Sequence, residues 1–160
     1  MTKSRKPPRP AVTVARAKNN EGSFGEILDM LLDLHKANGL AAFDATKAAE
    51  VAFRIIEQDM CWVARVGKTP VGTLALVEET FWYGDQTFLQ DAWFWVAPEY
   101  RPAAGTLLMK AARDEAQARN RICLVSTFNP DRRPKGRGLV TVTAGFVPIG
   151  YTLLLREDAS

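Results

Sequence analysis

The stretch WFWVAPEYRPAAGTLLMKAARDEA, residues 93–116, is the feature that most constrains the fold of this chain. Its first part is aromatic and β-branched, which is typical of a strand. Its second part is rich in alanine and leucine and carries its charges on one side, which is typical of a helix. The two parts meet at a short hinge of small residues after Arg101. The stretch therefore predicts a strand that turns directly into a helix.

Such a hinge is suited to an anionic group. The start of a helix leaves about four backbone N–H groups without partners, and the helix dipole adds roughly half a positive charge there. The small residues Ala103, Ala104, Gly105 and Thr106 allow a phosphate to approach the backbone, and Arg101 adds a forked donor. The alternative is a turn whose small residues serve only close packing.

The other segments predict the elements around this hinge. A first strand is expected at residues 11–17, followed by a helix that ends at Asn38-Gly39 and a second helix that Asp44 caps. Residues 61–66, 71–79 and 88–96 read as an antiparallel meander with turns at 67–70 and near 84–85. A helix from about residue 105 to 120 and a strand at 121–128 then add a parallel pair. The fold class is α/β, with a mixed, mostly antiparallel sheet flanked by helices.

Length and charge bound the organisation of the chain. With 160 residues and 47% hydrophobic residues, we expect one domain over residues 11–160, preceded by a mobile basic tail at 1–10. The formal net charge of +3 is mild and argues against a dedicated nucleic-acid binder. No run approaches the ~18 apolar residues of a membrane span, so we expect a cytoplasmic protein without membrane contact. The oligomeric state is left open.

The cysteines and the histidine indicate neither a metal site nor a nucleophile. Cys61 and Cys123 each lie in an apolar run and are interpreted as buried free thiols. The single histidine, His35, lies on the flank of a predicted helix, where a surface or half-packed role is expected. Two cysteines and one histidine at these separations give no zinc-ligand spacing, so no metal is predicted.

A family resemblance rests on two motifs. VAPEYRPAAGTLL resembles the acetyl-CoA-binding signature of the GNAT superfamily of N-acetyltransferases, and GF-x-P-x-G at residues 145–150 resembles its closing motif. The order of the predicted elements is also similar from Val12 to Arg156, which implies the acyl-CoA N-acyltransferase fold. The sequence as a whole resembles family members that phages encode. The resemblance implies acetyl-CoA as co-substrate and an amine of a protein or small molecule as acceptor.

The resemblance also implies a set of cofactor-binding residues. The backbone of Trp95 and Val96 would pair with the pantetheine arm, and the Val96 N–H would stabilise the oxyanion. The turn departs from the family pattern, because Pro102, Ala104 and Thr106 occupy positions that are commonly glycine. The full predicted set is Trp95, Val96, Arg101, Pro102, Ala103, Ala104, Gly105, Thr106 and Asn129.

The acid and the base are less clearly marked. Thr141 occupies the position where the family often has a proton-donating tyrosine, so Tyr151 is the candidate acid, with a water molecule as the alternative. Asp91, which we expect near the beginning of the signature strand, is the first candidate base, and Glu78 and Glu79 at the end of the preceding strand are the others. In each case a solvated strand end is the alternative. Two other functions stay open: a catalytically impaired GNAT-fold binding or structural module, and a nucleic-acid-associated protein that uses its basic tail and the loop at 131–137.

Overall fold

The computed structural model describes residues 11–39, 41–126 and 144–146. Within these residues, five strands form one sheet in the order β1-β2-β3-β4-β5. The strands are β1 (Val12–Arg16), β2 (Cys61–Val66), β3 (Thr69–Thr80), β4 (Thr87–Val96) and β5 (Ile122–Leu124). The helices are α1 (Glu21–Asn38), α2 (Ala45–Glu57), the short 3-10 helix η1 (Pro98–Tyr100) and α3 (Ala103–Ala118).

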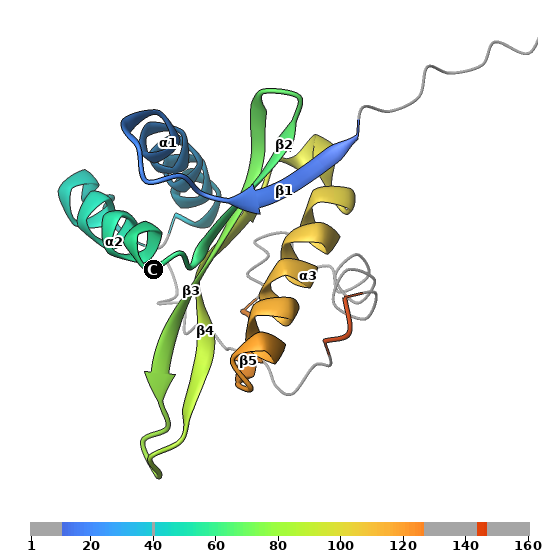
Figure 1. The fold of residues 1–160 in the computed structure, drawn as a ribbon. Coiled ribbons are helices and arrows are strands. Elements are labelled where there is room, and N and C mark those ends of the chain that lie inside the picture. Colours follow the sequence, from blue (N-terminus) through green and yellow to red (C-terminus); the bar gives the residue numbers. More distant parts are fainter. Residues whose placement is uncertain (1–10, 40, 127–143, 147–160) are drawn as a thin grey trace, which may run out of the picture.

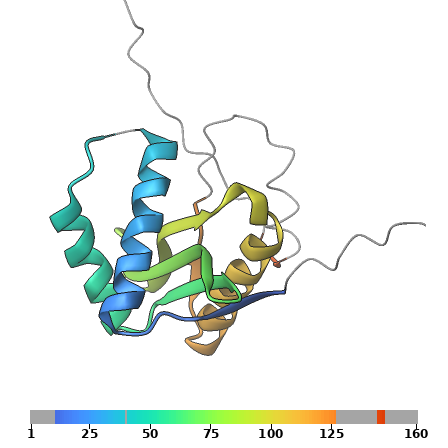
Figure 2. The same cartoon turned by 90° about the horizontal axis from the view of Figure 1, so that it is seen from above.

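The sheet is mixed, as the sequence predicts. The first four strands pair antiparallel in chain order, whereas β4 and β5 pair in parallel and are joined through α3. Helices α1 and α2 cover one face of the sheet and α3 covers the other (Figures 1 and 2). The predicted mixed sheet flanked by helices is therefore confirmed.

Local capping signals determine where the first two helices begin and end. The Asn20 side chain accepts a hydrogen bond from the Ser23 N–H at 2.9 Å, and Gly39 ends α1 in the left-handed conformation with φ +60°. The side chain of Asp44 accepts from the Lys47 N–H at 3.0 Å, which confirms the predicted cap of α2.

Three predicted boundaries shift. The β2–β3 turn is only Gly67-Lys68, because Val66 already pairs with Thr69. Gly67 takes φ +60°, the left-handed conformation that tight two-residue hairpin loops require. Helix α3 begins earlier than expected, and β5 ends at Leu124 rather than at 128. The tail at 1–10, the loop at 131–137 and the last predicted strand lie outside the described residues, apart from Gly145 and Phe146.

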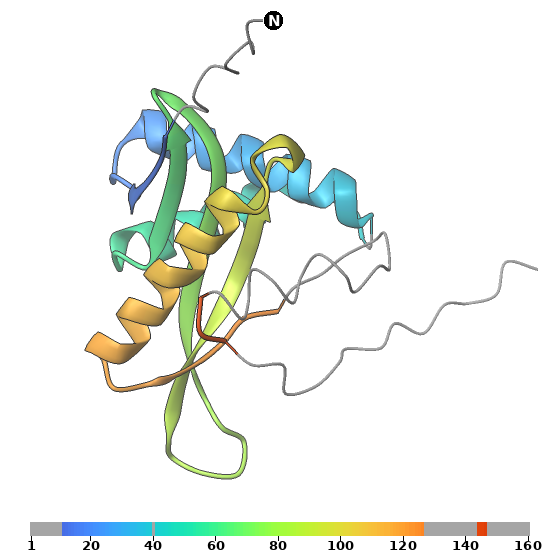
Figure 3. The ribbon, with the colours of Figure 1, turned by 90° about the vertical axis from the view of Figure 1, so that its right-hand side faces the viewer.

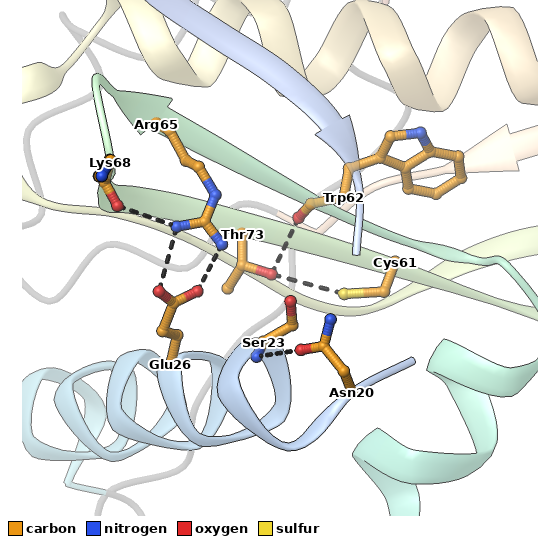
Figure 4. Close-up of polar contacts among 8 residues, drawn as sticks. All are labelled: Asn20, Ser23, Glu26, Cys61, Trp62, Arg65, Lys68 and Thr73. Atoms are coloured by element: carbon orange, nitrogen blue, oxygen red, sulfur yellow. Dashed lines mark hydrogen bonds and ion pairs between the residues drawn. The ribbon is translucent and has the colours of Figure 1, made fainter. Parts of the chain in front are cut away.

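A buried hydroxyl organises the core between the sheet and α1 (Figure 4). Thr73 is fully buried, and its Oγ1 donates to the Trp62 carbonyl at 3.0 Å and accepts from Trp93 Nε1 at 3.1 Å. Cys61 Sγ lies 3.7 Å from the same oxygen. The hydroxyl thus partners two groups that burial removes from water, one on β2 and one on β4.

Two charged contacts tie the sheet to the helices. Arg65 on β2 binds Glu26 on α1, and this hydrogen bond lowers the pKa of the Glu26 carboxyl, against the opposing effect of burial. On the other face, Glu115 of α3 is only 8% exposed and accepts from both Arg16 and Arg119 at 2.6 Å. Burial raises the pKa of Glu115, but the two arginines outweigh it and hold that pKa below its usual value.

Both cysteines are free, as predicted. Cys61 is buried, whereas Cys123 is only half-buried. Burial raises the pKa of each thiol to about 11, so both are neutral and unreactive near pH 7. None of the helices in the described ranges has the length and apolar character needed to cross a membrane.

Candidate functional site

Among the described residues, the pairing of β4 with β5 is confined to the first part of β4, and we call the rest of this side of β4 its open edge. Pairing between β4 and β5 runs from Phe88–Ile122 to Gln90–Leu124 and stops there, while β4 continues to Val96. Within residues 11–126, no strand pairs with this edge of β4 beyond Gln90. Parallel strands that part in this way leave a crevice that can admit a ligand beside the strand ends.

The register determines which backbone groups face this open edge. The Ala97 N–H donates to the Val71 carbonyl on β3 at 2.9 Å. Because backbone groups of successive strand residues point to opposite edges, the N–H and C=O groups of Val96 and Phe94 face away from β3. Arg101 Nε donates to the Val96 carbonyl at 2.8 Å, which agrees with this direction.

The same alternation corrects the prediction for Trp95. Trp95 lies two residues before Ala97, whose N–H bonds to β3, so by alternation the backbone groups of Trp95 also face β3. Its neighbour Phe94 takes its place beside Val96 on the open edge. The sequence does not indicate whether Phe94 or Trp95 faces the open edge, because this depends on the register between β3 and β4, which their packing determines.

The first turn of α3 presents backbone donors next to this edge. The first hydrogen bond of the helix runs from the Thr106 N–H to the Pro102 carbonyl at 2.9 Å. Pro102 is the N-cap residue, has no N–H of its own and makes no side-chain cap. The N–H groups that precede the first helical bond are therefore those of Ala103, Ala104 and Gly105. Ala103 is exposed, while Ala104 and Gly105 are buried against the sheet.

Gly72 on β3 brings the strand end and the helix together. A Cβ atom at this position would lie 3.0 Å from the Trp95 carbonyl oxygen, 3.1 Å from Val96 Cγ2 and 3.2 Å from Leu108 Cδ1 of α3. Only glycine allows this approach without displacing a neighbour. The residue was missed in the sequence, although a glycine inside a strand pattern is a known signal for close backbone contact.

Arg101 lies between the end of β4 and the start of α3. Its side chain is exposed, and its Nε holds the last carbonyl of β4. The two terminal nitrogens of the guanidinium are further donors on the same planar group. Arg101 thus places a permanent positive charge between the open strand edge and the start of α3.

Asp91 lies within β4 rather than at its beginning, which corrects the prediction. The register between β3 and β4 shifts at Ala75/Leu76, where Ala75 pairs with Trp93 and Leu76 with Asp91. Ala92 is the extra residue of this bulge. Asp91 Oδ1 accepts a hydrogen bond from the Ser126 N–H at 2.7 Å, just past the end of β5.

Burial determines the acidity of Asp91. Burial raises the pKa of the Asp91 carboxyl above its usual value, and the hydrogen bonds it accepts oppose this rise only in part. Its charge is also the second cause, after burial, of the raised pKa of Cys123. A carboxylate with a raised pKa, at the point where two strands part, has the properties of a proton acceptor.

The closing motif is described only at its start. Ala144 is buried in the core, and its carbonyl accepts from Arg113 Nη1 of α3 at 3.3 Å. Gly145 follows with φ +86°, a conformation that favours glycine. The predicted residues Asn129 and Tyr151, and Thr141 with them, lie outside the described residues.

The sequence predicts no metal site and a surface or half-packed role for His35. In the parts of the chain that the structure describes, no three His, Cys, Asp or Glu side chains gather as metal ligands would. His35 is half-buried, and its ring lies 5.2 Å from that of Phe43. It is remote in sequence from β4 and α3 and packs as predicted.

Three solved structures share this fold over most of the chain. One is a predicted acetyltransferase with acetyl-CoA from Clostridium acetobutylicum, with a TM-score of 0.67, 13% identity and coverage of 91% of this chain and 96% of that one. A ribosomal-protein-alanine N-acetyltransferase from Brucella melitensis biovar Abortus 2308 gives a TM-score of 0.60 and 16% identity over 92% and 99%. An aminoglycoside acetyltransferase from an uncultured soil metagenomic sample, in complex with sisomicin, gives 0.60 and 12% over 93% and 95%.

The sequence itself matches a family model. The match is to the acetyltransferase (GNAT) family and spans residues 27–134, which is more than half of the chain. No curated protein matches the sequence. The matched segment contains α2, the meander, the hinge after Arg101 and α3, and it therefore includes β4 and the start of α3, which form the open edge. The chain therefore belongs to the acetyltransferase (GNAT) family and is an acyltransferase of the GNAT type.

Proposed function

We propose that this protein transfers an acetyl group from acetyl-CoA to an amine. The observation that carries the proposal is the open edge of β4 beside the uncapped start of α3. The first offers backbone groups to an extended arm, and the second offers donors to a phosphate. Membership of the family and the fold shared with a structure that contains acetyl-CoA support the same proposal.

The residues of the site fit the parts of acetyl-CoA. The pyrophosphate would be held by Arg101 and by the N–H groups at the start of α3. Of these, the N–H of Ala103 belongs to an exposed residue and those of Ala104 and Gly105 to buried ones, while Pro102 and Thr106 would complete the turn. The pantetheine arm would lie along β4 as an added strand, on the side that Phe94 and Val96 face. Acetyl-CoA supplies a thioester, whose thiol leaves readily because its pKa is about 8.5.

Val96 is the proposed oxyanion donor. Its N–H lies on the open edge, where it would donate to the oxygen of the acetyl thioester, which gains negative charge when the amine attacks its carbonyl carbon. One such donor contributes about 10²–10³-fold to the rate. Because the donor is a backbone group that the β3 register orients, the contribution does not depend on the Val96 side chain.

Asp91 is the proposed general base. It receives a proton from the attacking amine through a water molecule, and it can do so only when ionised. Because burial raises its pKa, the rate should rise with pH through that raised value. Tyr151 is the proposed acid for the departing thiolate, and Asn129 is proposed to complete the cofactor site.

The acceptor is an amine of a protein or of a small molecule. Solved structures with this fold include a ribosomal-protein-alanine N-acetyltransferase and an aminoglycoside acetyltransferase with sisomicin, so the fold serves both classes. We place the reaction in the cytoplasm, where two free thiols such as Cys61 and Cys123 stay reduced.

Cofactor binding is tested by thermal unfolding with and without acetyl-CoA. A ligand at 100 times its Kd stabilises the folded state by about 2.7 kcal/mol, which is a measurable shift in Tm. Arg101→Glu should abolish the shift in Tm. Arg54→Glu, which changes an exposed side chain on α2, should retain the shift. An unchanged shift in Arg101→Glu would contradict the proposed phosphate site.

Acetyl transfer is tested separately by thiol release with a panel of amines. The panel should contain peptides with free amino termini, lysine peptides and aminoglycosides. We expect release of CoA that depends on the amine. A protein that binds acetyl-CoA tightly and releases no thiol with any amine would contradict the proposed reaction while leaving the binding site intact.

A further inference from the structure

The hairpin of β3 and β4 extends past the helices at one end of the molecule (Figures 1 and 3). Pairing of β3 with β2 ends at Ala75–Cys61, and pairing of β4 with β5 does not reach beyond Phe88. We call residues 78–88 the hairpin tip. Between Thr80 and Thr87 only β3 and β4 remain in the described sheet, and this part projects from the body (Figures 1 and 3).

A row of aromatic rings in mutual contact lies on the hairpin tip. The ring of Phe81 stacks on Phe88 at 4.3 Å and on Tyr83 at 5.3 Å, and Tyr83 meets Trp82 edge-on at 5.3 Å. Phe88 is 8% exposed, Tyr83 is 69% exposed and Trp82 is 93% exposed. The row therefore starts in the body and ends by holding two large rings in solvent. Trp82 is too exposed to contribute to the core, and together with Tyr83 it forms an exposed aromatic patch of the kind that marks interaction sites.

The hairpin carries only negative charge. From Thr69 to Tyr100 the sequence contains Glu78, Glu79, Asp85, Asp91 and Glu99 but no lysine or arginine, although the net charge of the whole chain is +3. Three of these carboxylates, at 78, 79 and 85, are exposed in the hairpin tip. In the described part of the chain, none of the three forms an ion pair. Glu79 pairs with Phe88, so it lies on the face of the aromatic row.

We propose that the hairpin tip is a docking surface for a lysine- and arginine-rich segment of a partner protein. Ammonium and guanidinium groups bind the faces of tryptophan and tyrosine and pair with carboxylates, and the tip offers both. Small-molecule sites are concave. A projecting tip instead suits an extended chain that can lie across it. The proposal concerns binding and does not require acetyl transfer.

The edge of β3 offers main-chain bonds to such a segment. The Leu76 N–H donates to the Met60 carbonyl, so Leu76 faces the side on which β2 lies. By alternation, the backbone groups of Glu78 and Thr80 face the same side. No strand among the described residues pairs with them there. An extended segment can therefore add as a strand and place its basic side chains beside Glu79 and the rings.

Fluorescence anisotropy with a labelled peptide of alternating lysine and glycine tests the proposal on the full-length protein without acetyl-CoA. We expect Trp82→Ala to weaken binding about 3- to 30-fold, and Glu79→Gln about 2- to 5-fold. Phe53→Ala, which removes an exposed ring from α2, should leave binding unchanged. Raising the salt from about 50 to 200 mM should weaken binding of the unaltered protein.

Folding and competing occupants are checked in the same experiment. Trp82 is 93% exposed, so Trp82→Ala should melt at the temperature of the unaltered protein. Equal binding of a glutamate–glycine peptide, or unchanged binding in both tip variants, would overturn the proposal. Displacement of the peptide by spermine at equal concentration would assign the tip to small polyamines instead. Self-association at the tip, shown by light scattering and abolished by Trp82→Ala, would assign it to a second copy.

Discussion

Replacing Asp91 by asparagine separates its charge from its place in the fold. Asparagine retains an oxygen that can accept the Ser126 N–H, which lies at 2.7 Å, but it cannot take a proton from an amine. We expect kcat/KM for the amine to fall about 10²–10⁴-fold, the usual contribution of a general base. The affinity for acetyl-CoA should not change, because the open edge and the start of α3 are untouched.

Asp91→Asn should be more stable than the unaltered protein, although its activity is lower. Burial raises the pKa of Asp91, so its carboxyl favours folding below the usual pKa of about 3.9, and this contribution is lost as the pH rises through the raised value. At pH 7 the native protein carries a disfavoured buried charge, and Asp91→Asn does not. We therefore expect Asp91→Asn to melt at a higher temperature at pH 7, with a difference that narrows as the pH falls towards 4.

Two further variants make this test decisive. Asp91→Ala also loses the bond to Ser126 and should be about 0.5–1.5 kcal/mol less stable than Asp91→Asn. Asp29→Asn, an exposed carboxyl on α1, should change neither activity nor melting. Thiol-release kinetics and thermal unfolding over a pH series provide the measurements. Turnover of Asp91→Asn within twofold of the unaltered protein would refute the role as base, and so would an activity loss that follows weakened acetyl-CoA binding.

Three predictions concern a close backbone contact at the site and two buried polar groups elsewhere in the fold. Gly72→Ala should destabilise the fold by about 1–3 kcal/mol in urea unfolding and weaken acetyl-CoA binding, because its Cβ would lie 3.0 Å from a backbone oxygen. Gly25→Ala, with open space around it in α1, should instead stabilise by about 0.5–1 kcal/mol, and equal effects of the two would contradict the close approach. Thr73→Val should cost about 1–3 kcal/mol by leaving Trp93 Nε1 unpartnered, whereas Thr73→Ser should cost less. Glu115→Gln should lower the free energy of unfolding by about 1–3 kcal/mol at pH 7. This loss is smaller than for a fully buried ion pair because the two arginine partners are 44% and 40% exposed. Since the Glu115 pKa is lowered, that loss should disappear as the pH falls through the lowered value, and a loss that persists at acid pH would contradict it.

Local signals allowed much of the fold to be predicted. Asn38-Gly39 and Asp44 mark helix ends through bonds within a few residues, and the structure has both caps. The small residues after Arg101 likewise mark the start of α3 within two residues. These features need only neighbouring residues, so a single sequence contains the information that specifies them.

The details of the site could not be predicted in this way. Whether Trp95 or Phe94 faces the open edge depends on a register that a shift of one residue reverses. The bulge that places Asp91 next to Ser126 arises from the pairing of β3 with β4 and has no mark in the residues around it. Gly72 acts through contacts with Val96 and the distant Leu108, which only packing brings together.

The agreement of strand order with chain order has a consequence for how the molecule is made. Each of the first four strands has its partner immediately before or after it in the chain, so during synthesis every new strand meets a neighbour that has already left the ribosome. The pairs β2–β3 and β3–β4 close through short loops, which lowers the entropic barrier to their formation, whereas α1 and α2 separate β1 from β2. The parallel strand β5 must wait for the whole of α3. The site between β4 and the start of α3 is therefore expected to form late and slowly during folding.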